Sequence, residues 1–136
     1  MTTQQHTPEH HLGASGPHDR GPHDLGRRGE DLAAEYLTER GLVVLSRNWR
    51  CREGELDVVA TDGTTLVVCE VKTRSTDDFG DPAEFVTPAK LRHVRQATQA
   101  WLRRYRVGWC RVRYDVVAVL WPAGGVPRLR HVRGVF

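Results

Sequence analysis

Two short apolar segments bordered by charged residues limit the folds open to this chain more than any other feature. Asp57 leads directly into Val58-Val59-Ala60, and Val67-Val68-Cys69 runs directly into Glu70-Val71-Lys72. Continuous apolar runs of this kind are typical of strands that are covered on both faces. The turn residues Asp62-Gly63 between them favour a hairpin. Because a charge in such a setting is costly unless it is paired or bound to a metal ion, these charged residues are candidates for a site.

Alternation along a strand decides which of these charges lie together. Side chains two residues apart point the same way, so Glu70 shares a face with Lys72, and Glu55 shares one with Asp57. If the two strands pair with these faces in common, two or three carboxylates and one ammonium group converge on the sheet. Carboxylates can hold a hard cation such as Mg²⁺, and a lysine beside it can stabilise charge on a phosphate. The pattern indicates a phosphodiesterase site, and a solvated Glu-Lys pair at a strand end stays open as the alternative.

Length and composition set the broad class of the protein. A chain of 136 residues with 39% hydrophobic content suits one globular domain with a buried core. The sequence has no run of about 18 apolar residues and no basic and apolar leader, so we expect a cytoplasmic protein with no membrane partner. Its three cysteines, odd in number and far apart, fit neither a disulfide framework nor a zinc site, and we expect reduced thiols.

Charge is divided unevenly along the chain. Residues 1–88 hold 9 Lys or Arg against 16 Asp or Glu, whereas residues 89–136 hold 11 against Asp115 alone. A basic half beside an acidic cluster suits a protein that grips a polyanion such as nucleic acid and holds a metal ion next to it. A solvated basic helix, or a basic surface for an acidic protein partner, is the alternative.

The hydrophobic pattern predicts a single domain over residues 24–136 after a disordered tail. Residues 1–23 are rich in His, Pro, Gly, Ser and Thr and cannot bury enough apolar surface to offset the entropy of ordering. The domain is expected to begin with a helix over residues 25–40 and three strands over 42–49, 56–61 and 65–72. A second helix from residue 88 to at least 106 and strands over 113–120 and 129–135 should follow.

The first predicted helix places an acid on its packing face. Glu30 lies on the same face as Ala33, Ala34 and Leu37, which should pack on the sheet. Glu30 is therefore a candidate to join the site from above the sheet. An acid that only complements the N-terminal end of the helix dipole is an equal alternative.

The second predicted helix separates apolar from basic residues. Trp101 and Tyr105 share its apolar face, where packing in the core is the expectation and base stacking the alternative. The other side and its flanks carry candidates for phosphate contacts, namely Arg92, Arg95, Arg103 and Arg106.

Four stretches of the sequence carry a resemblance to a known family. They are Gly29-Glu30-Asp31-Leu32-Ala33-Ala34 with Tyr36-Leu37, Gly54-Glu55-Leu56-Asp57-Val58-Val59-Ala60, Glu70-Val71-Lys72-Thr73-Arg74 and Arg113-Tyr114-Asp115-Val116-Val117. With the order of elements, they make the chain resemble the PD-(D/E)XK nuclease superfamily and, more narrowly, the small bacterial YraN-like family of predicted endonucleases. The resemblance covers residues 25–136. It implies an α/β fold with a restriction-endonuclease-like core, in which helices flank a central mixed sheet.

The resemblance also implies a role for each residue of the site. Asp57 and Glu70 would be the ligands of Mg²⁺ or Mn²⁺, and Lys72 would be the catalytic lysine. Glu30 matches an acid of the first helix that archaeal Holliday-junction resolvases, relatives by fold, add to the same site. Glu55 lies beside this set as a secondary partner. Leu56 stands where the superfamily nominally has proline.

We therefore expect a metal-dependent endonuclease that hydrolyses phosphodiester bonds in DNA, with branched or structured DNA among its candidate substrates. Resolvases act as dimers, so a homodimer is compatible with the resemblance. A non-catalytic nucleic-acid-binding accessory protein on the same fold stays open, as does a protein-interaction module whose basic face meets an acidic partner. The intact set of Asp57, Glu70 and Lys72 argues against the accessory protein.

Overall fold

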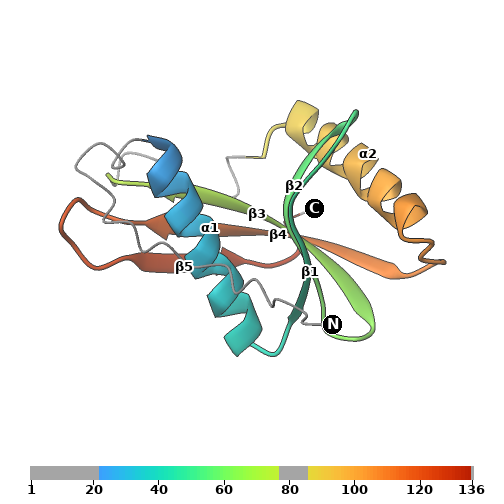
Figure 1. The fold of residues 1–136 in the computed structure, drawn as a ribbon, viewed down its shortest axis with the longest axis horizontal. Helices are drawn as coiled ribbons and strands as arrows, with labels where there is room; N and C mark the ends of the chain where they lie inside the picture. The colour runs from blue at the N-terminus through green and yellow to red at the C-terminus, as the bar shows by residue number, and fades with distance from the viewer. Residues whose placement is uncertain (1–21, 77–85, 136) are drawn as a thin grey trace, which may run out of the picture.

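Two helices cover the opposite faces of a five-stranded mixed sheet (Figure 1). The computed structural model describes residues 22–76 and 86–135. In chain order the elements are α1 (Pro22–Glu39), β1 (Val43–Cys51), β2 (Gly54–Thr61), β3 (Thr65–Arg74), α2 (Pro88–Arg104), β4 (Arg111–Leu120) and β5 (Arg128–Val132). This order confirms the expected α/β class with a restriction-endonuclease-like core.

The strands lie side by side in their sequence order, from β1 to β5. Neighbouring strands are antiparallel except β3 and β4, which run parallel from the pair Thr65 and Arg111 to the pair Arg74 and Leu120. A parallel pair needs a crossover connection, and α2 supplies it. β3 is therefore the central strand of the sheet.

β2 separates from β3 part-way along its length. The β2–β3 ladder ends at the pair Val58 and Cys69, whereas β2 stays paired with β1 as far as Gly54. Val58 packs in the core cluster under α1, but Leu56, two residues earlier, packs in the cluster under α2. The strand therefore twists away from β3 at Asp57, and this residue lies at the split between the two strands.

Each helix packs through a small apolar face. α1 contributes Ala33 and Leu37, which are fully buried, to the core on its side of the sheet. α2 contributes Val94, Ala97 and Trp101 to the other core. Trp101 is 4% exposed, and its indole N–H donates to Ser46 Oγ at 3.0 Å, so the expected core role is confirmed for this tryptophan.

Tyr105 departs from the expected core packing. It caps the C-terminal end of α2 and stacks on Trp101 with ring centroids 4.8 Å apart, but it remains 47% exposed. The helix ends at Arg104, so Tyr105 lies beyond the last turn of α2 that packs on the sheet.

A glycine brings α1 close to the central strand. Gly29 is buried, and a Cβ atom at this position would overlap the side chain of Thr73 on β3. Gly26, one turn earlier, has no neighbour within 4 Å of such a Cβ. The absence of a side chain at Gly29 thus sets how closely α1, and Glu30 with it, approaches β3.

Every element differs from its sequence-based boundaries by a few residues, and the start of α1 and the end of β5 differ by three residues each. α1 begins at Pro22, not at residue 25, because proline suits the first helical position and Asp24 complements the helix dipole in the first turn. Residues 22 and 23 of the predicted tail therefore belong to the helix, and residues 1–21 lie outside the described residues. β5 ends at Val132, before residue 135, because Gly134 turns the chain with φ +59°.

Two expectations about the whole chain can be compared with the described ranges. Cys51, Cys69 and Cys110 are free thiols, as expected. No helix within residues 22–76 and 86–135 is long and apolar enough to cross a membrane.

Candidate functional site

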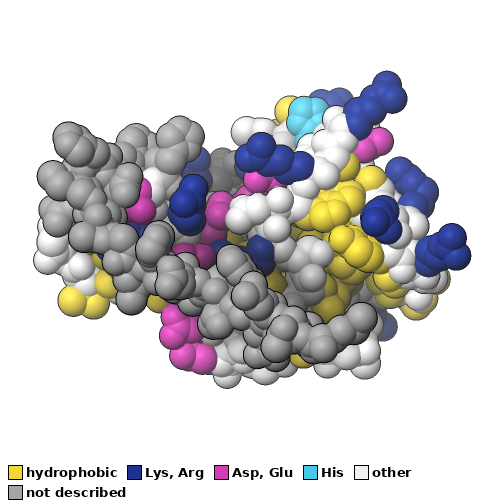
Figure 2. Space-filling view, in the orientation of Figure 1, with side chains coloured by type: hydrophobic (Ala, Val, Ile, Leu, Met, Phe, Trp, Pro, Cys, Tyr) yellow, Lys and Arg dark blue, Asp and Glu magenta, His cyan; other side chains and the backbone are white. Residues whose placement is uncertain are grey.

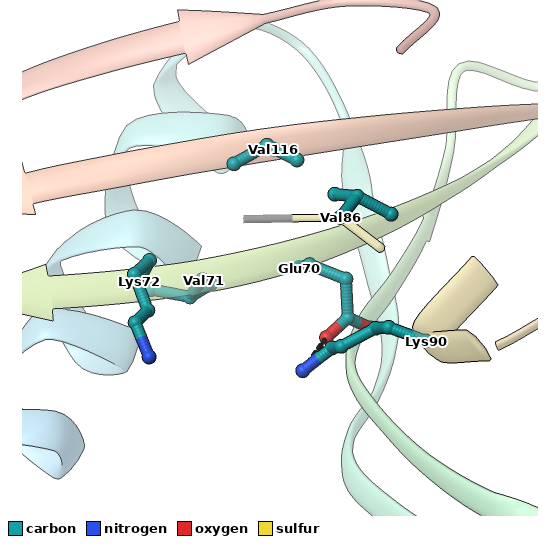
Figure 3. A pocket seen from close by; sticks show the side chains of 6 residues that line it. All are labelled: Glu70, Val71, Lys72, Val86, Lys90 and Val116. Atoms are coloured by element: carbon teal, nitrogen blue, oxygen red, sulfur yellow. Dashed lines mark ion pairs between the residues drawn. The ribbon is translucent and has the colours of Figure 1, made fainter. Parts of the chain in front are cut away.

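Glu70 lies at the centre of a small pocket between β3 and the first turn of α2 (Figure 3). The pocket is lined by Glu70, Val71, Lys72, Val86, Lys90 and Val116, and its volume is about 70 Å³. That is room for several water molecules or a hydrated ion, but not for a nucleotide. Any larger substrate would therefore present only one group, such as a phosphate, to the pocket.

Asp57 is held at the split between β2 and β3. Its Oδ2 accepts a hydrogen bond of 2.8 Å from the backbone N–H of Val71, just beyond the end of the strand ladder. Burial raises the pKa of the Asp57 carboxyl, and the Val71 N–H opposes that rise. The hydrogen bond leaves the second carboxylate oxygen available for another partner.

Glu70 is a buried carboxyl whose neighbours do not fully offset the cost of burying its charge. It is 8% exposed, and burial, followed by the negative charge of Asp57, raises its pKa to about 8. Within the described residues no N–H or O–H group donates to its buried Oε1, and the Glu70 carboxyl lies within hydrogen-bond reach of the Asp57 carboxyl. Buried polar atoms are nearly always satisfied in native proteins, so two carboxyls held this close together fit a proton or a cation between them.

Lys90 is the ion-pair partner of Glu70, and the sequence-based reading missed it. Its Nζ lies 3.3 Å from Glu70 Oε2, and its side chain is half-exposed. The residue lies in the first turn of α2, where its backbone N–H donates to the capping hydroxyl of Thr87 at 3.1 Å. A signal was present in the sequence: Lys72 and Lys90 are the only lysines among 20 basic residues, and both line this pocket.

Lys72 projects from β3 on the same side as Glu70 and Lys90, as Figure 3 shows. Desolvation, followed by the positive charges of Arg74 and Lys90, lowers the pKa of the Lys72 ammonium. The charge of Asp57 opposes this effect. The pocket therefore holds two ammonium groups and a protonatable carboxyl within one electrostatic cluster.

Glu30 approaches the cluster from α1. Its pKa is raised by burial and then by the negative charge of Asp57, while a hydrogen bond from Asn48 lowers it. Glu30 and Asp57 are thus close enough to influence each other. In residues 22–76 and 86–135, however, no three His, Cys, Asp or Glu side chains are placed to hold one metal ion together. A metal ion at this site would share two carboxylates and complete its shell with water.

Glu55 lies at the margin of the site. Its side chain is 41% exposed, and Oε1 is 3.5 Å from Nε of Arg50 on the neighbouring strand. Its charge still raises the pKa values of Asp57 and Glu30. This position is compatible with the secondary role expected for Glu55.

The basic residues expected to contact nucleic acid do not line the pocket; they are spread along α2 and just beyond its far end. Arg92, Arg95 and Arg103 are exposed on α2, and Arg106 is exposed just after it. Figure 2 shows acidic side chains grouped near the centre of the face between the two helices, with basic side chains around them and along the side where α2 runs. A polyanion could follow this basic border while one of its phosphates reaches the acidic centre.

A second cluster of charged residues, also missed from the sequence, is structural. Asp115 on β4 is 1% exposed and accepts two hydrogen bonds of 2.9 Å from Arg113 and one of 3.0 Å from the Gly134 N–H. His131 Nε2 lies 2.8 Å from its Oδ2, and Tyr36 Oη is 3.3 Å from the other ring nitrogen. Burial alone would raise the pKa of Asp115, but these partners outweigh it and lower the pKa to about 2. A fully satisfied carboxylate of this kind ties β4, the end of the chain and α1 together.

Comparisons with known proteins identify the family. The family model described as "Uncharacterised protein family UPF0102" matches residues 29–119. The chain belongs to this family. The matched range begins at Gly29 and includes Asp57, Glu70, both lysines of the pocket and Asp115. The resemblance to the YraN-like family is thereby confirmed.

Individual relatives of the UPF0102 family match most of their own length. A UPF0102 protein of Acidothermus cellulolyticus is 50% identical over 122 residues, which cover 82% of this chain and 92% of the relative. One from Kineococcus radiotolerans is 51% identical over 119 residues, covering 87% and 98%. One from Rhodococcus opacus is 50% identical over 112 residues, covering 82% and 95%.

Proposed function

We propose that this UPF0102 protein is a divalent-metal-dependent endonuclease that hydrolyses phosphodiester bonds in DNA in the cytoplasm. One observation carries the proposal: the buried Glu70 carboxyl lies within hydrogen-bond reach of the Asp57 carboxyl, and it shares its pocket with both lysines of the chain. Asp57 and Glu70 would hold Mg²⁺ or Mn²⁺. When bound, the ion supplies positive charge at the phosphate and lowers the pKa of a water molecule.

The carboxyls of this chain are suited to a reversible metal site. Glu70, with a pKa of about 8, is largely protonated at neutral pH without an added cation. Metal ligands must be deprotonated, so ion binding would displace this proton. Glu30, half-buried and with a raised pKa, is the neighbouring group that would accept a proton from the attacking water.

The two lysines would divide the work of charge stabilisation. Lys90, whose Nζ is 3.3 Å from Oε2, would stabilise the negative charge of Glu70 once the carboxyl has lost its proton. Lys72 projects into the same pocket from the strand that carries Glu70, and would stabilise the charge that develops on the phosphate. Partial desolvation and the positive charges of Arg74 and Lys90 lower its pKa.

The proposal is tested by incubating labelled linear, nicked and four-way-junction DNA with the purified protein in Mg²⁺, in Mn²⁺ and in EDTA. Cleavage that requires the metal and is lost in Glu70→Gln supports it. Glu35→Gln, which alters an exposed acid on α1, is the matched control and should cleave like the wild type. Equal cleavage by both variants would trace the activity to a contaminant, and no cleavage of any substrate would contradict the proposal.

The second candidate is a non-catalytic nucleic-acid-binding accessory protein. It is favoured by the lack of a three-ligand metal cluster in the described part of the chain. It predicts DNA binding that does not change between EDTA and Mg²⁺ and no cleavage in either. A mobility-shift measurement beside the cleavage assay separates the two functions.

A further inference from the structure

The loop between α2 and β4 exposes a tryptophan almost completely. Trp109 is 94% exposed, whereas Trp101 is buried and Trp49 and Trp121 are half-buried. Large aromatic side chains are normally highly buried, and those left on a surface are enriched where a partner binds. Trp109 belongs to neither core cluster, so packing in the core does not explain why a tryptophan stands at this position.

The backbone that leads to Trp109 is fixed. The N–H of Val107 donates to the carbonyl of Leu102 at 2.9 Å, and the N–H of Arg106 donates to that of Arg103 at 3.2 Å. These are the two bonds of a Schellman motif, which normally places glycine in the left-handed position. Here Arg106 holds that position with φ +53°, a conformation that is unfavourable for a residue with a Cβ. The chain therefore leaves α2 in a defined direction, with an arginine at a position where glycine would adopt the backbone conformation at lower cost.

The surroundings of Trp109 are strongly basic. Arg104, Arg106 and Arg111 are exposed on either side of it along the chain, and residues 89–114 contain no acid. The β2–β3 turn brings Asp62 near the start of β4, but its carboxylate is engaged by the backbone N–H groups of Thr64 and Thr65. The surface is complementary in charge to a polyanion.

We propose that Trp109 with Arg104, Arg106 and Arg111 binds an unpaired strand of nucleic acid, the indole stacking on a base and the arginines contacting phosphates. In a duplex each base is already stacked on its neighbours, whereas an unpaired base offers a free face to an aromatic side chain. Arginines on each side supply the phosphate contacts that such stacking surfaces use. The proposal rests on the proposed nuclease function and specifies its substrate class as DNA with an unpaired segment.

The length of α2 sets the distance between this surface and the pocket. The helix has 17 residues; Lys90 lies in its first turn, and Trp109 follows its last residue, Arg104, by five positions. At about 1.5 Å per residue the helix spans roughly 25 Å. At about 3.4 Å per nucleotide along one strand of a duplex, this corresponds to roughly seven paired nucleotides. The unpaired base should therefore lie about that far from the phosphate in the pocket.

The proposal is tested by DNA binding in EDTA, where no turnover occurs. Fluorescence anisotropy compares a single-stranded oligonucleotide, the blunt duplex of the same sequence and that duplex with a single-stranded overhang. Trp109→Ala should weaken binding of the single strand and the overhang on the order of tenfold, and of the blunt duplex far less. Trp109→Phe, which keeps an aromatic face, should lose less. Val126→Ala removes another exposed apolar side chain, on the loop before β5, and should bind all three like the wild type.

Two results would overturn the proposal. Equal affinity of Trp109→Ala and the wild type for the single strand and the overhang would show that the indole does not stack on bases. Loss of self-association in Trp109→Ala by sedimentation, with unchanged DNA affinity, would assign the surface to a second copy of the chain. The nuclease proposal is tested by a different measurement: it fails if the wild type cleaves no DNA in Mg²⁺ or Mn²⁺, whatever the binding assay shows.

Discussion

Asp57 Oδ2 accepts the backbone N–H of Val71 at 2.8 Å, at the point where β2 leaves β3. The carboxylate thereby satisfies an amide that the strand ladder no longer reaches. Asp57 has a structural role in addition to its proposed role as a metal ligand, and the two roles can be separated by substitution.

Asp57→Asn should lose metal binding and cleavage together while the fold stays intact. The amide oxygen of Asn still accepts the Val71 N–H, and a neutral group suits the buried position, where the pKa of Asp57 is raised. Asp57→Ala leaves that N–H without its acceptor and should cost a further ~1–3 kcal/mol of unfolding free energy. Urea unfolding and calorimetric Mn²⁺ titration measure the two effects. Equal stability of both variants would contradict the structural role.

Lys72→Ala should reduce cleavage by a factor on the order of 10² while metal and DNA still bind. The substitution removes an ammonium group from the pocket but leaves both proposed ligands in place. Single-turnover cleavage rates at saturating protein measure the loss. A rate equal to that of the wild type would remove Lys72 from the proposed mechanism, whatever the metal dependence shows.

Glu70 should make the protein less stable as the pH rises through the neutral range. Its pKa in the folded state is raised to about 8, so the folded state binds more protons than the unfolded chain between pH 4.5 and that value. Stability from the protonated form is therefore present at low pH and lost as the pH rises towards 8. The loss should amount to a few kcal/mol, with about 5 kcal/mol as the upper limit.

Urea unfolding from pH 5 to pH 9 in EDTA measures this loss. Glu70→Gln should flatten the profile, and Glu35→Gln should leave it unchanged. Mg²⁺ should restore stability at high pH in the wild type and in Glu35→Gln, but not in Glu70→Gln. A wild-type profile that rises over this range would show that Glu70 is not the protonated group.

Gly29→Ala should destabilise the fold by roughly 1–3 kcal/mol, because the added Cβ overlaps Thr73 and α1 must move away from β3. Gly26→Ala is the matched control, since its Cβ meets nothing within 4 Å. It should be neutral or stabilising by up to about 1 kcal/mol. Thermal unfolding of the two variants compares them directly. The same sign for both would mean that α1 is not packed as closely as described.

Arg106→Gly should raise stability and lower DNA affinity in the same protein. Glycine relieves the left-handed backbone at φ +53° by up to about 1 kcal/mol, but it also removes a charge beside Trp109. The slope of log affinity against log salt should flatten by about one unit per lost phosphate contact. Gains in stability with an unchanged salt slope would show that Arg106 is only solvated.

The sequence predicted the elements well because each had a local cause. The continuous apolar run Val58-Val59-Ala60 followed by the Asp62-Gly63 turn is enough for a hairpin. The spacing of Glu30 with Ala33 and Leu37 is enough for the packing face of α1. What the local pattern could not show was where the hairpin stops. The split at Asp57 depends on β2 twisting towards α2. This is a tertiary effect, and no periodic pattern of hydrophobic residues in the sequence indicates it.

The missed residues share a physical reason. Lys90 is near Glu70 because α2 crosses over the sheet, and 20 residues separate the two in the chain. His131 reaches Asp115 only after β5 returns beside β4. The exposure of Trp109 could not be predicted either. Whether an aromatic residue in a loop is exposed depends on whether another segment of the folded chain packs over it. Pairing of distant charges and exposure both require the fold.

The parallel pairing of β3 with β4 has a consequence for the order in which the protein forms. Every pair in that ladder joins residues 46 positions apart in the chain. Contacts of such separation are slow to form, because the intervening loop must be closed before any of them contributes. The β1–β2–β3 meander can assemble early from local contacts, but β3 then remains an edge strand. On the ribosome, Glu70 and Lys72 therefore lie at an open edge until α2 and β4 have been synthesised, and the pocket is completed late in folding.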